Sequence, residues 1–515
     1  MRGHRRRPAL LDQLLARFVQ LESLPRLARV RAQPHETQAR VLTALLARAQ
    51  ATEWGRRYGF GEAPGPADFA RRVPISSYEQ LYPEIERVLR GAADVLWPGR
   101  PAWFAQSSGT TNARSKYIPV SPESLRQGHF RAGRDMLALS THLYPQARLL
   151  AGKTLSLGGS HAPAPLGGPA RAGDVSALIV HNLPPWAEAL RTPPRPLALL
   201  PEWEEKIERI ARHVLRQDVR VLAGVPTWMT LLLRRVVALA GADTILDVWP
   251  HLALFLHGAV AFAPYRALYA SLIPSPAMRY LEIYNASEGY FALQDQPDCP
   301  DLLLLLDHGI YYEFLPPDQW DAPDPQALPL CDVQIGPSYA LVISTNAGLW
   351  RYAVGDTVRF TSLAPYRVRI TGRTRHFLNA FGEEVMVENA EAAVAAACHA
   401  TGTAVRDFTV APVWFGLEAA SRGGHEWAVE FAGPPPPQPA AFAEALDEAL
   451  GAVNSDYAAK RHRSLALAPP RLHVLPPGTF ELWLAQQGKL GGQHKVPRLA
   501  NTRTLLEEVL ALAAG

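Results

Sequence analysis

The sequence predicts an α/β fold in two parts: a large N-terminal layered α/β domain and a smaller α+β C-terminal domain. Between residues 100 and 372, short apolar runs alternate with segments of helical periodicity. Such alternation is typical of layered α/β folds with largely parallel sheets. After Gly372 the pattern becomes a smaller mixture of helices and strands. A chain of 515 residues also exceeds one ordinary domain, so we expect domains at 1–372 and 373–515.

The individual elements follow from the spacing of apolar residues, because short apolar runs favour buried strands and longer periodic segments favour helices. The expected strands are at 219–225, 252–256, 280–284, 302–306, 341–345, 408–413 and 427–431. The expected helices are at 202–215, 229–239, 388–401 and 440–453. The proline-rich tract 433–439 suits only a surface loop.

Two amphipathic helices are expected near the start of the chain. The first places apolar residues at helical spacing: Leu10, Leu11, Leu14, Leu15 and Phe18. We expect this helix to pack on the body of the protein. The second, at 36–49, has an apolar face: Leu42, Leu45, Leu46 and Ala49. The polar, glycine-bearing stretch 52–61 is expected to end it.

Composition excludes several classes of function. The chain is 48% hydrophobic and 19% charged, which is typical of a soluble globular enzyme. A net charge of +4 without a basic stripe argues against nucleic-acid binding. The chain has no apolar run long enough to predict a signal peptide or a membrane span. Cys299, Cys331 and Cys398 lack metal-ligand spacing and indicate reduced cytoplasmic thiols.

Lysine is scarce in this chain. The sequence has 52 basic residues, of which six are lysine: Lys116, Lys153, Lys206, Lys460, Lys489 and Lys495. Heavy use of Ala, Arg, Pro, Gly and Leu suggests a GC-rich bacterial genome, in which exposed cations drift towards arginine. The remaining lysines are then enriched where a compact ammonium works and a planar guanidinium does not. Chance survival is the alternative for any single lysine.

The first motif is a hydroxyl-rich loop with one glycine: Ser107, Ser108, Gly109, Thr110 and Thr111. It follows a short strand signal at 103–105, and Lys116 comes soon after it. Backbone N–H groups and hydroxyls of such a loop can surround phosphate oxygens. The Walker spacing is missing, and an ordinary Ser/Thr turn is the alternative.

The second motif directly follows the expected strand at 280–284 and runs Tyr284, Asn285, Ala286, Ser287, Glu288 and Gly289. Ligands of open α/β sheets bind at the carboxyl ends of strands. Tyr284 there suits stacking on a purine, Ser287 suits a phosphate oxygen, and Glu288 suits Mg²⁺. A solvated loop glutamate is the alternative for Glu288.

The third motif ends in Gly355-Asp356, within Tyr352-Ala353-Val354-Gly355-Asp356. An acidic side chain after a strand can accept hydrogen bonds from both ribose hydroxyls, as it does in dinucleotide sites. An ordinary Gly-Asp turn is the alternative.

The fourth motif lies at the expected domain boundary. It runs Gly372, Arg373, Thr374, Arg375, His376 and Phe377, and continues through 381–385. Glycine and mixed charge suit a hinge there, and a plain linker explains the pattern equally well.

The fifth motif is a glycine-rich basic stretch near the C-terminus, running from Lys489 through Gly491, Gly492 and Lys495 to Arg498. A lysine on such a loop can place an ammonium beside a developing phosphate charge. A solvated basic loop is the alternative.

The order of the five motifs resembles that of the adenylate-forming superfamily. Within it, the chain closely resembles the Gretchen Hagen (GH3) family of acyl acid amido synthetases, its bacterial branch most of all. Besides the first three motifs, this resemblance rests on Thr52-Glu53-Trp54-Gly55-Arg56, on 382–390 and on Gln493-His494-Lys495-Val496-Pro497-Arg498. It covers the chain from Gln38 to Asn501.

The resemblance implies an ATP-dependent ligase with an adenylation domain at 1–372 and a mobile C-terminal domain at 373–515. Such an enzyme converts a carboxylic acid into its acyl-AMP with loss of pyrophosphate, and then transfers the acyl group to an amine, expected to be that of an amino acid. Adenylation is chemically necessary because a carboxylate repels nucleophiles and lacks a good leaving group. ATP and Mg²⁺ are the implied cofactors.

The resemblance also implies roles for individual residues. The implied phosphate contacts are Ser107, Ser108, Gly109, Thr110 and Thr111. Tyr284 is implied to line the adenine, Ser287 to contact the α-phosphate and Glu288 to bind Mg²⁺. Asp356 and Arg373 are implied to hold the ribose. Lys495 would cancel charge where the α-phosphate meets the acyl carboxylate, and would then move away so that the amine can enter.

Three points depart from the family pattern or stay open. The hinge carries Arg375-His376 where the superfamily usually has an acidic residue or lysine, so the pivot is open. Lys489 competes with Lys495, which we prefer for its Lys-Val-Pro-Arg context. The candidate acyl-pocket residues follow strands, and core packing is the alternative for each: Thr227, Trp228, Gly258 and Ala259. An acyl-CoA ligase and a catalytically silent binding protein are the alternative functions.

Overall fold

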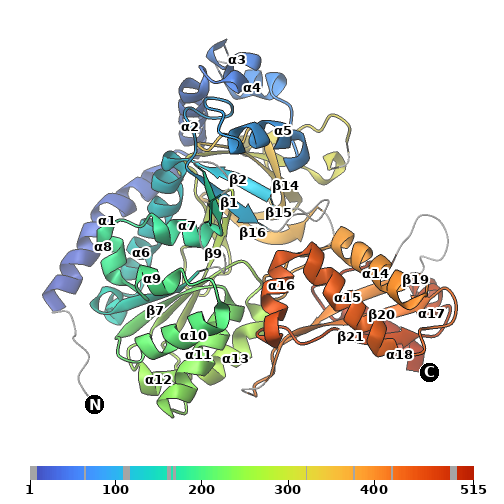
Figure 1. The fold of residues 1–515 in the computed structure, drawn as a ribbon. Coiled ribbons are helices and arrows are strands. Elements are labelled where there is room, and N and C mark those ends of the chain that lie inside the picture. The colour runs from blue at the N-terminus through green and yellow to red at the C-terminus, as the bar shows by residue number, and fades with distance from the viewer. Residues whose placement is uncertain are drawn as a thin grey trace.

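The structure is a computed structural model and describes residues 9–62, 65–107, 116–158, 164–165, 170–320, 322–374, 377–418, 421–487 and 496–514. A large N-terminal part is built around a long twisted sheet. A smaller C-terminal part, orange to red in Figure 1, lies against helices α11 (Pro226–Ala240) and α13 (Arg266–Leu272) of the large part. Within the described ranges, no helix is long and apolar enough to cross a membrane.

The central sheet of the N-terminal part has twelve strands. Their spatial order is β13 (Leu328–Pro329), β12 (Ile310–Leu315), β14 (Ser338–Thr345), β15 (Tyr352–Leu363), β16 (Tyr366–Arg373), β11 (Leu302–Leu304), β10 (Gly289–Gln294), β9 (Arg279–Ala286), β8 (Leu254–His257), β7 (Val219–Gly224), β3 (Lys153–Leu157) and β6 (Arg191–Thr192). The five N-terminal strands expected from apolar runs are therefore confirmed, with shifted ends.

The expectation of a largely parallel sheet is wrong for the larger part of it, since seven of the eleven strand pairings are antiparallel. Strands from β9 to β6 pair in parallel, whereas every pairing from β9 to β13 is antiparallel. The physical reason is burial, because strands β10, β12 and β14 are covered on both faces and so carry continuous apolar runs. Such runs resemble those of parallel strands.

Helices cover both faces of the parallel part of the sheet, from β9 to β6. Successive side chains of a strand point to opposite faces, and here both sets are apolar and buried. Leu222 and Phe255 face a cluster built from α10 (Trp203–Val214), α11 (Pro226–Ala240) and α13 (Arg266–Leu272). Their neighbours Val221 and Leu254 face α1 (Ala9–Ala32) and α6 (Arg131–Leu143). The expected helices at 202–215 and 229–239 are thus confirmed as α10 and α11.

Helix α1 packs on the body of the protein, but through a different face from the one expected. Leu14 and Phe18 are 55% and 73% exposed, whereas Val19 and Leu27 are buried. The helix continues to Ala32, and its orientation is fixed by Arg26, which bonds Asp135 of α6. The short apolar pattern therefore predicted that this segment is a helix, but it did not predict which face of the helix is buried.

The expected break after the second helix is only partly confirmed. Helix α2 (Pro34–Ala49) buries the predicted face, but the following polar stretch contains α3 (Glu53–Arg57). Thr52 starts α3, because its hydroxyl accepts a hydrogen bond from the Gly55 amide at 2.9 Å. Gly55 has no room for a side chain, since a Cβ there would lie 2.1 Å from the Ala49 carbonyl.

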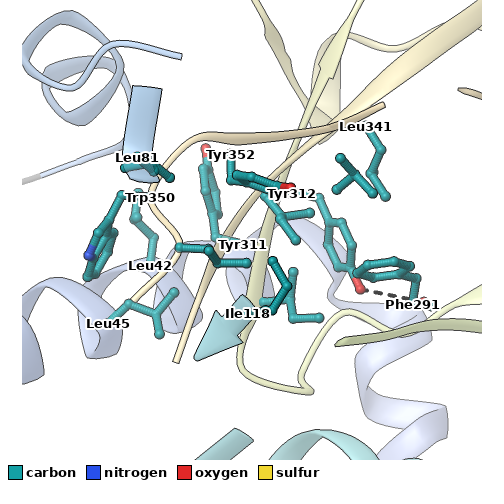
Figure 2. Packing of buried hydrophobic residues seen from close by; sticks show 14 of the residues in the cluster. Leu42, Leu45, Leu81, Ile118, Phe291, Tyr311, Tyr312, Leu341, Trp350 and Tyr352 are labelled. Atoms are coloured by element: carbon teal, nitrogen blue, oxygen red, sulfur yellow. Dashed lines mark hydrogen bonds between the residues drawn. The ribbon is translucent and has the colours of Figure 1, made fainter. Parts of the chain in front are cut away.

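A second sheet has four strands, and its buried side chains belong to the same hydrophobic core as the start of β15. The strands are β2 (Lys116–Val120), β1 (Trp103–Ser107), β5 (Arg171–Gly173) and β4 (Ala164–Pro165). Figure 2 shows Trp350 and Tyr352 packed among α2 and β12. Trp350 also donates to the Leu96 carbonyl at 2.9 Å. The strand that carries Asp356 therefore begins in a rigid core.

The N-terminal part contains six further α-helices among its described residues. They are α4 (Pro66–Arg72), α5 (Tyr78–Leu89), α7 (Val175–His181), α8 (Pro185–Leu190), α9 (Arg195–Ala198) and α12 (Ile245–Val248).

The C-terminal part is a three-stranded sheet with helices on both faces. Its strands are β19 (Val405–Val413), β20 (Gly424–Phe431) and β21 (Arg471–Leu475), and its helices are α14 (Val387–Thr401), α15 (Pro439–Val453), α16 (Ser455–Arg461), α17 (Thr479–Gln486) and α18 (Thr504–Ala514). On β20, Trp427 and Val429 face α14 and α15, whereas Ala428 faces α17 and α18. The elements expected beyond residue 387 are confirmed.

The two parts share buried contacts. Along the chain, β16 is the last strand of the large sheet and stops at Arg373. The next strands, β17 (Phe377–Leu378) and β18 (Val385–Met386), form a separate two-stranded sheet among the described residues. Between them, Ala380 accepts a hydrogen bond from Tyr265 at 2.8 Å. Tyr265 also lies against Phe415 of the C-terminal part.

Candidate functional site

The β9–β10 hairpin places the second motif at the edge of a polar cluster. Ala286 pairs with Gly289, so Ser287 and Glu288 form the two-residue turn between the strands. Gly289 packs closely against β12 there, since a Cβ would lie 2.6 Å from the terminal methyl group of Ile310. The tight hairpin fixes where the Glu288 carboxylate lies.

Strands β15 and β16 bring the third and fourth motifs together. Asp356 and Arg373 are direct cross-strand partners, and Arg373 Nε donates to Asp356 Oδ1 at 2.7 Å. Gly355 has φ +93°, a conformation that favours glycine. Its carbonyl accepts from the Thr374 amide at 2.9 Å. Two residues that are seventeen positions apart therefore form one ion pair.

Tyr284 joins the hairpin to this ion pair. Its hydroxyl donates to Asp356 Oδ2 at 2.7 Å, so both carboxylate oxygens of Asp356 have partners. The Tyr284 ring is buried and lies edge-on to Phe291 at 4.9 Å. Burial, reinforced by Asp356, raises the pKa of the Tyr284 phenol, which therefore stays a donor. That Tyr284 lines an adenine stays a prediction; the contact present is to Asp356.

Glu288 lies near both positive and negative side chains: Lys116, Arg373 and Asp356. Burial raises the pKa of its carboxyl, and Asp356 adds to the rise, while Lys116 and Arg373 oppose it. Tyr352 donates to Glu288 Oε1 at 3.4 Å. Burial lowers the pKa of the Lys116 ammonium, and Glu288 opposes that change. The charge on each of these groups depends on its neighbours, which is common at functional sites.

The oxygen donors of this cluster suit Mg²⁺ together with phosphate. Mg²⁺ binds one or two carboxylates and takes its other ligands from water or substrate phosphates. Glu288 at the hairpin tip, with the charge of Asp356 nearby, matches that need. In the described part of the chain, no three His, Cys, Asp or Glu side chains form a preassembled metal site. A metal held by Glu288 would take its other ligands from substrate phosphates and water.

Several predicted site residues lie outside the described residues or at their margin. Ser107 ends β1 and pairs in register with Lys116 at the start of β2, so these two residues lie next to each other. Outside the described residues are Ser108, Gly109, Thr110, Thr111, Arg375, His376, Lys489 and Lys495. Their predicted roles stay predictions.

The candidate acyl-pocket residues make packing contacts and hydrogen bonds within the fold, and these contacts account for the residue types at their positions. Thr227 and Trp228 are buried, the former bonded to Tyr265 at 2.8 Å and the latter stacked on Trp203 at 3.7 Å. Gly258 passes so close to β9 that a Cβ would lie 2.5 Å from the Ile283 carbonyl. The close approach of Gly258 places the end of β8 beside β9, the strand that carries Tyr284.

Ala259 has a constrained backbone at the boundary of the two parts. Its φ is +70°, which is uncommon for a residue other than glycine. Its carbonyl accepts from the Asn379 side chain at 3.1 Å. Ala259 is therefore held from the C-terminal side.

Sequence reasoning missed two contacts of the cluster. The hydroxyl of Tyr352 reaches Glu288, and the carboxylate of Glu384 ion-pairs with Arg373. Glu384 stood within a quoted motif, but no spacing rule connects it with Arg373 eleven residues earlier. The only usable signal was the Gly-Glu-Glu sequence at an expected hinge.

Comparison with solved structures defines the class of fold. An acyl acid amido synthetase titled AtGH3.15, in complex with 2,4-DB, superposes with a TM-score of 0.61 at 19% identity, covering 96% of each chain. A 2-hydroxyisobutyryl-CoA ligase superposes with a TM-score of 0.54 at 14% identity, covering 93% of this chain and 92% of that one. The chain therefore has the adenylate-forming fold.

Family models then identify the family. The GH3 family N-terminal domain matches residues 23–278, the central domain matches 303–373, and the C-terminal domain matches 388–504. Together the three models cover most of the chain, which belongs to the GH3 family.

Two curated relatives are similar to this chain along nearly its whole length. A probable indole-3-acetic acid-amido synthetase GH3.2 of Oryza sativa subsp. japonica is 26% identical, covering 91% of this chain and 89% of the relative. Indole-3-acetic acid-amido synthetase GH3.3 of Arabidopsis thaliana is 23% identical, covering 91% and 90%. The predicted resemblance to the GH3 family is confirmed, and its bacterial branch stays a prediction.

Proposed function

We propose that this protein is an ATP-dependent acyl acid–amido synthetase. It adenylates a carboxylic acid with release of pyrophosphate and transfers the acyl group to an amine, expected to be that of an amino acid. The observation that carries the proposal is the polar cluster in which Tyr284, Glu288, Asp356 and Arg373 meet from two hairpins. Membership of the GH3 family supports the same reaction.

The nucleotide would bind along this cluster. Asp356 and Arg373 would hold the ribose, since an acceptor and a donor lie side by side there. Ser287 would contact the α-phosphate, and the hydroxyl-rich loop 107–111 would contact the other phosphates. When bound, Mg²⁺ on Glu288 would neutralise phosphate charge. Lys116 would add a cation beside the same carboxylate.

Lys495 would supply the charge needed during adenylation. Two anions, the acyl carboxylate and the α-phosphate, must meet, and an ammonium between them stabilises the transition state more than the separated substrates. We propose a boundary that leaves residues 1–372 as the adenylation domain and 373–515 as a mobile C-terminal domain. Movement of the latter would withdraw Lys495 before the amine attacks.

The decisive experiment measures exchange of labelled pyrophosphate into ATP with a broad panel of carboxylic acids. Acid-dependent exchange is expected, because formation of an acyl-AMP is reversible. If no acid in the panel supports exchange while ATP binds, a catalytically silent binding protein on this fold explains the chain better.

A second assay separates the two possible products. With an acid that supports exchange, AMP release is compared in the presence of amino acids and of coenzyme A. Stimulation by an amino acid is expected. Stimulation by coenzyme A alone would favour an acyl-CoA ligase, and the fold shared with the 2-hydroxyisobutyryl-CoA ligase is the reason to include this arm.

A further inference from the structure

The loop between β17 and β18 carries two adjacent glutamates that contact different parts of the protein. Glu383 bonds His425 of β20 in the C-terminal sheet. Glu384 ion-pairs with Arg373 at the end of β16 in the large sheet. A single peptide unit therefore connects the C-terminal part with the proposed ribose site.

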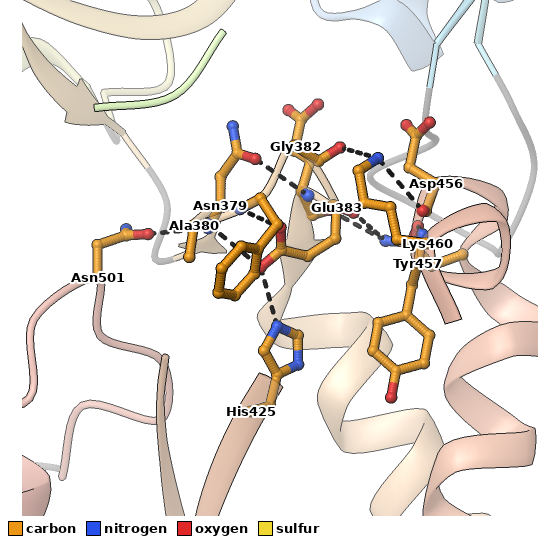
Figure 3. Close-up of polar contacts among 12 residues, drawn as sticks. Asn379, Ala380, Gly382, Glu383, His425, Asp456, Tyr457, Lys460 and Asn501 are labelled. Carbon is orange, nitrogen blue, oxygen red and sulfur yellow. Dashed lines mark hydrogen bonds and ion pairs between the residues drawn. The ribbon is translucent and has the colours of Figure 1, made fainter. Parts of the chain in front are cut away.

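Glu383 is held by three donors. The Glu383 side chain is buried, and its carboxylate accepts from His425 Nε2 at 2.8 Å and from the Ala380 amide at 3.2 Å (Figure 3). It also accepts from the Phe381 amide at 2.6 Å. Although burial opposes it, the hydrogen bond from His425 keeps the pKa of the Glu383 carboxyl below its usual range. A buried carboxylate with this many donors fixes the backbone around it.

Two further side chains hold the carbonyls of the same loop. The Asn454 amide donates to the Glu383 carbonyl at 2.9 Å and to the Glu384 carbonyl at 3.1 Å. Lys460 donates to the Gly382 carbonyl at 2.7 Å. Both residues are buried, and both belong to the start or body of α16. Figure 3 shows Lys460 reaching the loop from that helix.

These contacts hold an unusual backbone. Gly382 has φ +87°, and Glu384 has φ +42°. A positive φ is uncommon for a residue other than glycine and persists where the surroundings impose it. In this conformation the Glu384 side chain contacts Arg373.

Arg373 is fixed between two carboxylates. Its Nε donates to Asp356 at 2.7 Å, and its Nη1 donates to Glu384. The Arg373 side chain is 17% exposed. Because a guanidinium is planar and its donors are rigidly arranged, two carboxylate partners define its orientation.

We propose that Glu384 is a positioning residue of the nucleotide site, which orients Arg373 for the ribose, and that Glu383, His425 and Asn454 hold Glu384 in place. This proposal rests on the proposed function, in which Asp356 and Arg373 bind the ribose. Glu384 would act through Arg373 and not by its own contact with the nucleotide, and this loop would connect the C-terminal part with ribose binding.

The test replaces Glu384 with Gln and with Asn. Gln keeps the length of the side chain, and Asn tolerates positive φ. Either change is expected to weaken ATP binding by about tenfold, in line with loss of a charged hydrogen bond, while kcat changes much less. Preference for ATP over 2′-deoxy-ATP should shrink, because the oriented guanidinium faces the ribose. Glu481→Gln, an exposed charge on α17, is the matched control.

Two results would overturn the proposal. One is an unchanged preference for ATP over 2′-deoxy-ATP in both Glu384 variants. The other is tighter ATP binding, which would mean that Glu384 repels phosphate. Calorimetric titration with each nucleotide measures binding whether or not adenylation occurs, so failure of the proposed function is seen separately, as absent pyrophosphate exchange in the wild type.

The anchoring residues are tested through their dependence on Glu384. Asn454→Ala and His425→Gln are made in the wild type and in a Glu384→Ala background, with thermal unfolding as the check on folding. Each should weaken ATP binding in the wild type and add nothing in the Glu384→Ala background. Additive losses would overturn the coupling. If His425→Gln does not fold, Lys460→Met addresses the same loop.

Discussion

Tyr284 donates its phenolic hydrogen to Asp356 across 2.7 Å, and this contact joins two hairpins that are more than seventy positions apart in the chain. Asp356 Oδ1 accepts from Arg373 at the same time. The carboxylate that we propose for the ribose is therefore oriented before any ligand arrives. Preorganisation of this kind lowers the cost of binding.

Removal of this hydroxyl tests the importance of that orientation. Tyr284→Phe leaves the packed ring and deletes the donor to Asp356. Because one buried neutral-to-charged hydrogen bond is lost, stability is expected to fall by about 1 to 3 kcal/mol. The KM for ATP should rise by about tenfold for the same reason.

Steady-state kinetics and denaturant unfolding measure the two effects of Tyr284→Phe. Tyr280→Phe is the matched control, because Tyr280 lies four residues earlier on the same strand. Equal effects of the two substitutions on ATP would contradict a specific role for Tyr284.

Glu288 provides a prediction for pH. Its pKa is raised by burial above the ordinary 4.5, so the carboxylate takes up a proton at a higher pH than an exposed glutamate does. As the pH falls through that raised pKa, the proposed Mg²⁺ ligand is lost. The Mg²⁺ concentration that gives half-maximal activity should therefore rise as the medium is acidified, beginning above pH 4.5.

Glu288→Gln should remove this component of the pH profile and lower kcat/KM by about 100-fold at fixed Mg²⁺, as expected when a metal ligand of the transition state is lost. Glu282→Gln is the control, because burial also raises the pKa of Glu282 on the same hairpin. A Glu288→Gln enzyme with the wild-type Mg²⁺ requirement would rule out the proposed ligand.

The sequence predicted the motifs of the site better than their connections. Asp356 and Arg373 were each assigned to the ribose, and the register of β15 and β16 makes them partners. Glycines at 355 and 289 also marked real turns or close approaches. Local chemistry of this kind is visible in a sequence because it depends on neighbours along the chain.

Contacts between distant segments were invisible. No local pattern connects Glu384 to Arg373, or Tyr352 to Glu288, because those contacts depend on how two hairpins and the C-terminal part pack. The same limit explains the sheet. Apolar runs predicted buried strands such as β14, but burial on both faces does not determine whether neighbours are parallel.

The buried ion cluster between α1 and α6 gives a prediction for stability. Asp135 is fully buried and accepts from Arg26 and from His308, the latter at 3.0 Å. Although burial opposes it, the bond from His308 and the charge of Arg26 keep the pKa of Asp135 below its usual range. A lowered pKa contributes stability above the pKa of the unfolded state, and that stability is lost as the pH falls through the folded value.

Asp135→Asn should lower the free energy of unfolding at neutral pH by about 2 kcal/mol, because it removes one of the two carboxylates that Arg26 contacts and leaves Asp307 as the other. The difference from the wild type should shrink in acid. Glu22→Gln is the control, since Glu22 is 64% exposed and pairs with Arg134 between the same two helices. Its effect should stay below about 1 kcal/mol. Urea unfolding at several pH values compares the variants, and equal losses would contradict the proposed role of burial.

Lys495 is the residue on which the proposed chemistry depends most. Lys495→Ala should abolish acid-dependent pyrophosphate exchange, because no ammonium would then offset the meeting of carboxylate and α-phosphate. ATP should still bind, since Asp356, Arg373 and Glu288 belong to the N-terminal sheet. Lys495→Arg should also fail, because a guanidinium is wider and directs its donors differently.

Lys489→Ala is the matched control for Lys495, because it removes the other lysine of the same glycine-rich stretch. Exchange measured beside calorimetric ATP binding separates a defect in chemistry from one in affinity. Loss of exchange in Lys489→Ala with wild-type rates in Lys495→Ala would transfer the role to Lys489. Wild-type exchange in both variants would mean that the charge comes from elsewhere, and Lys116, whose ammonium interacts with Glu288, would be the next residue to replace.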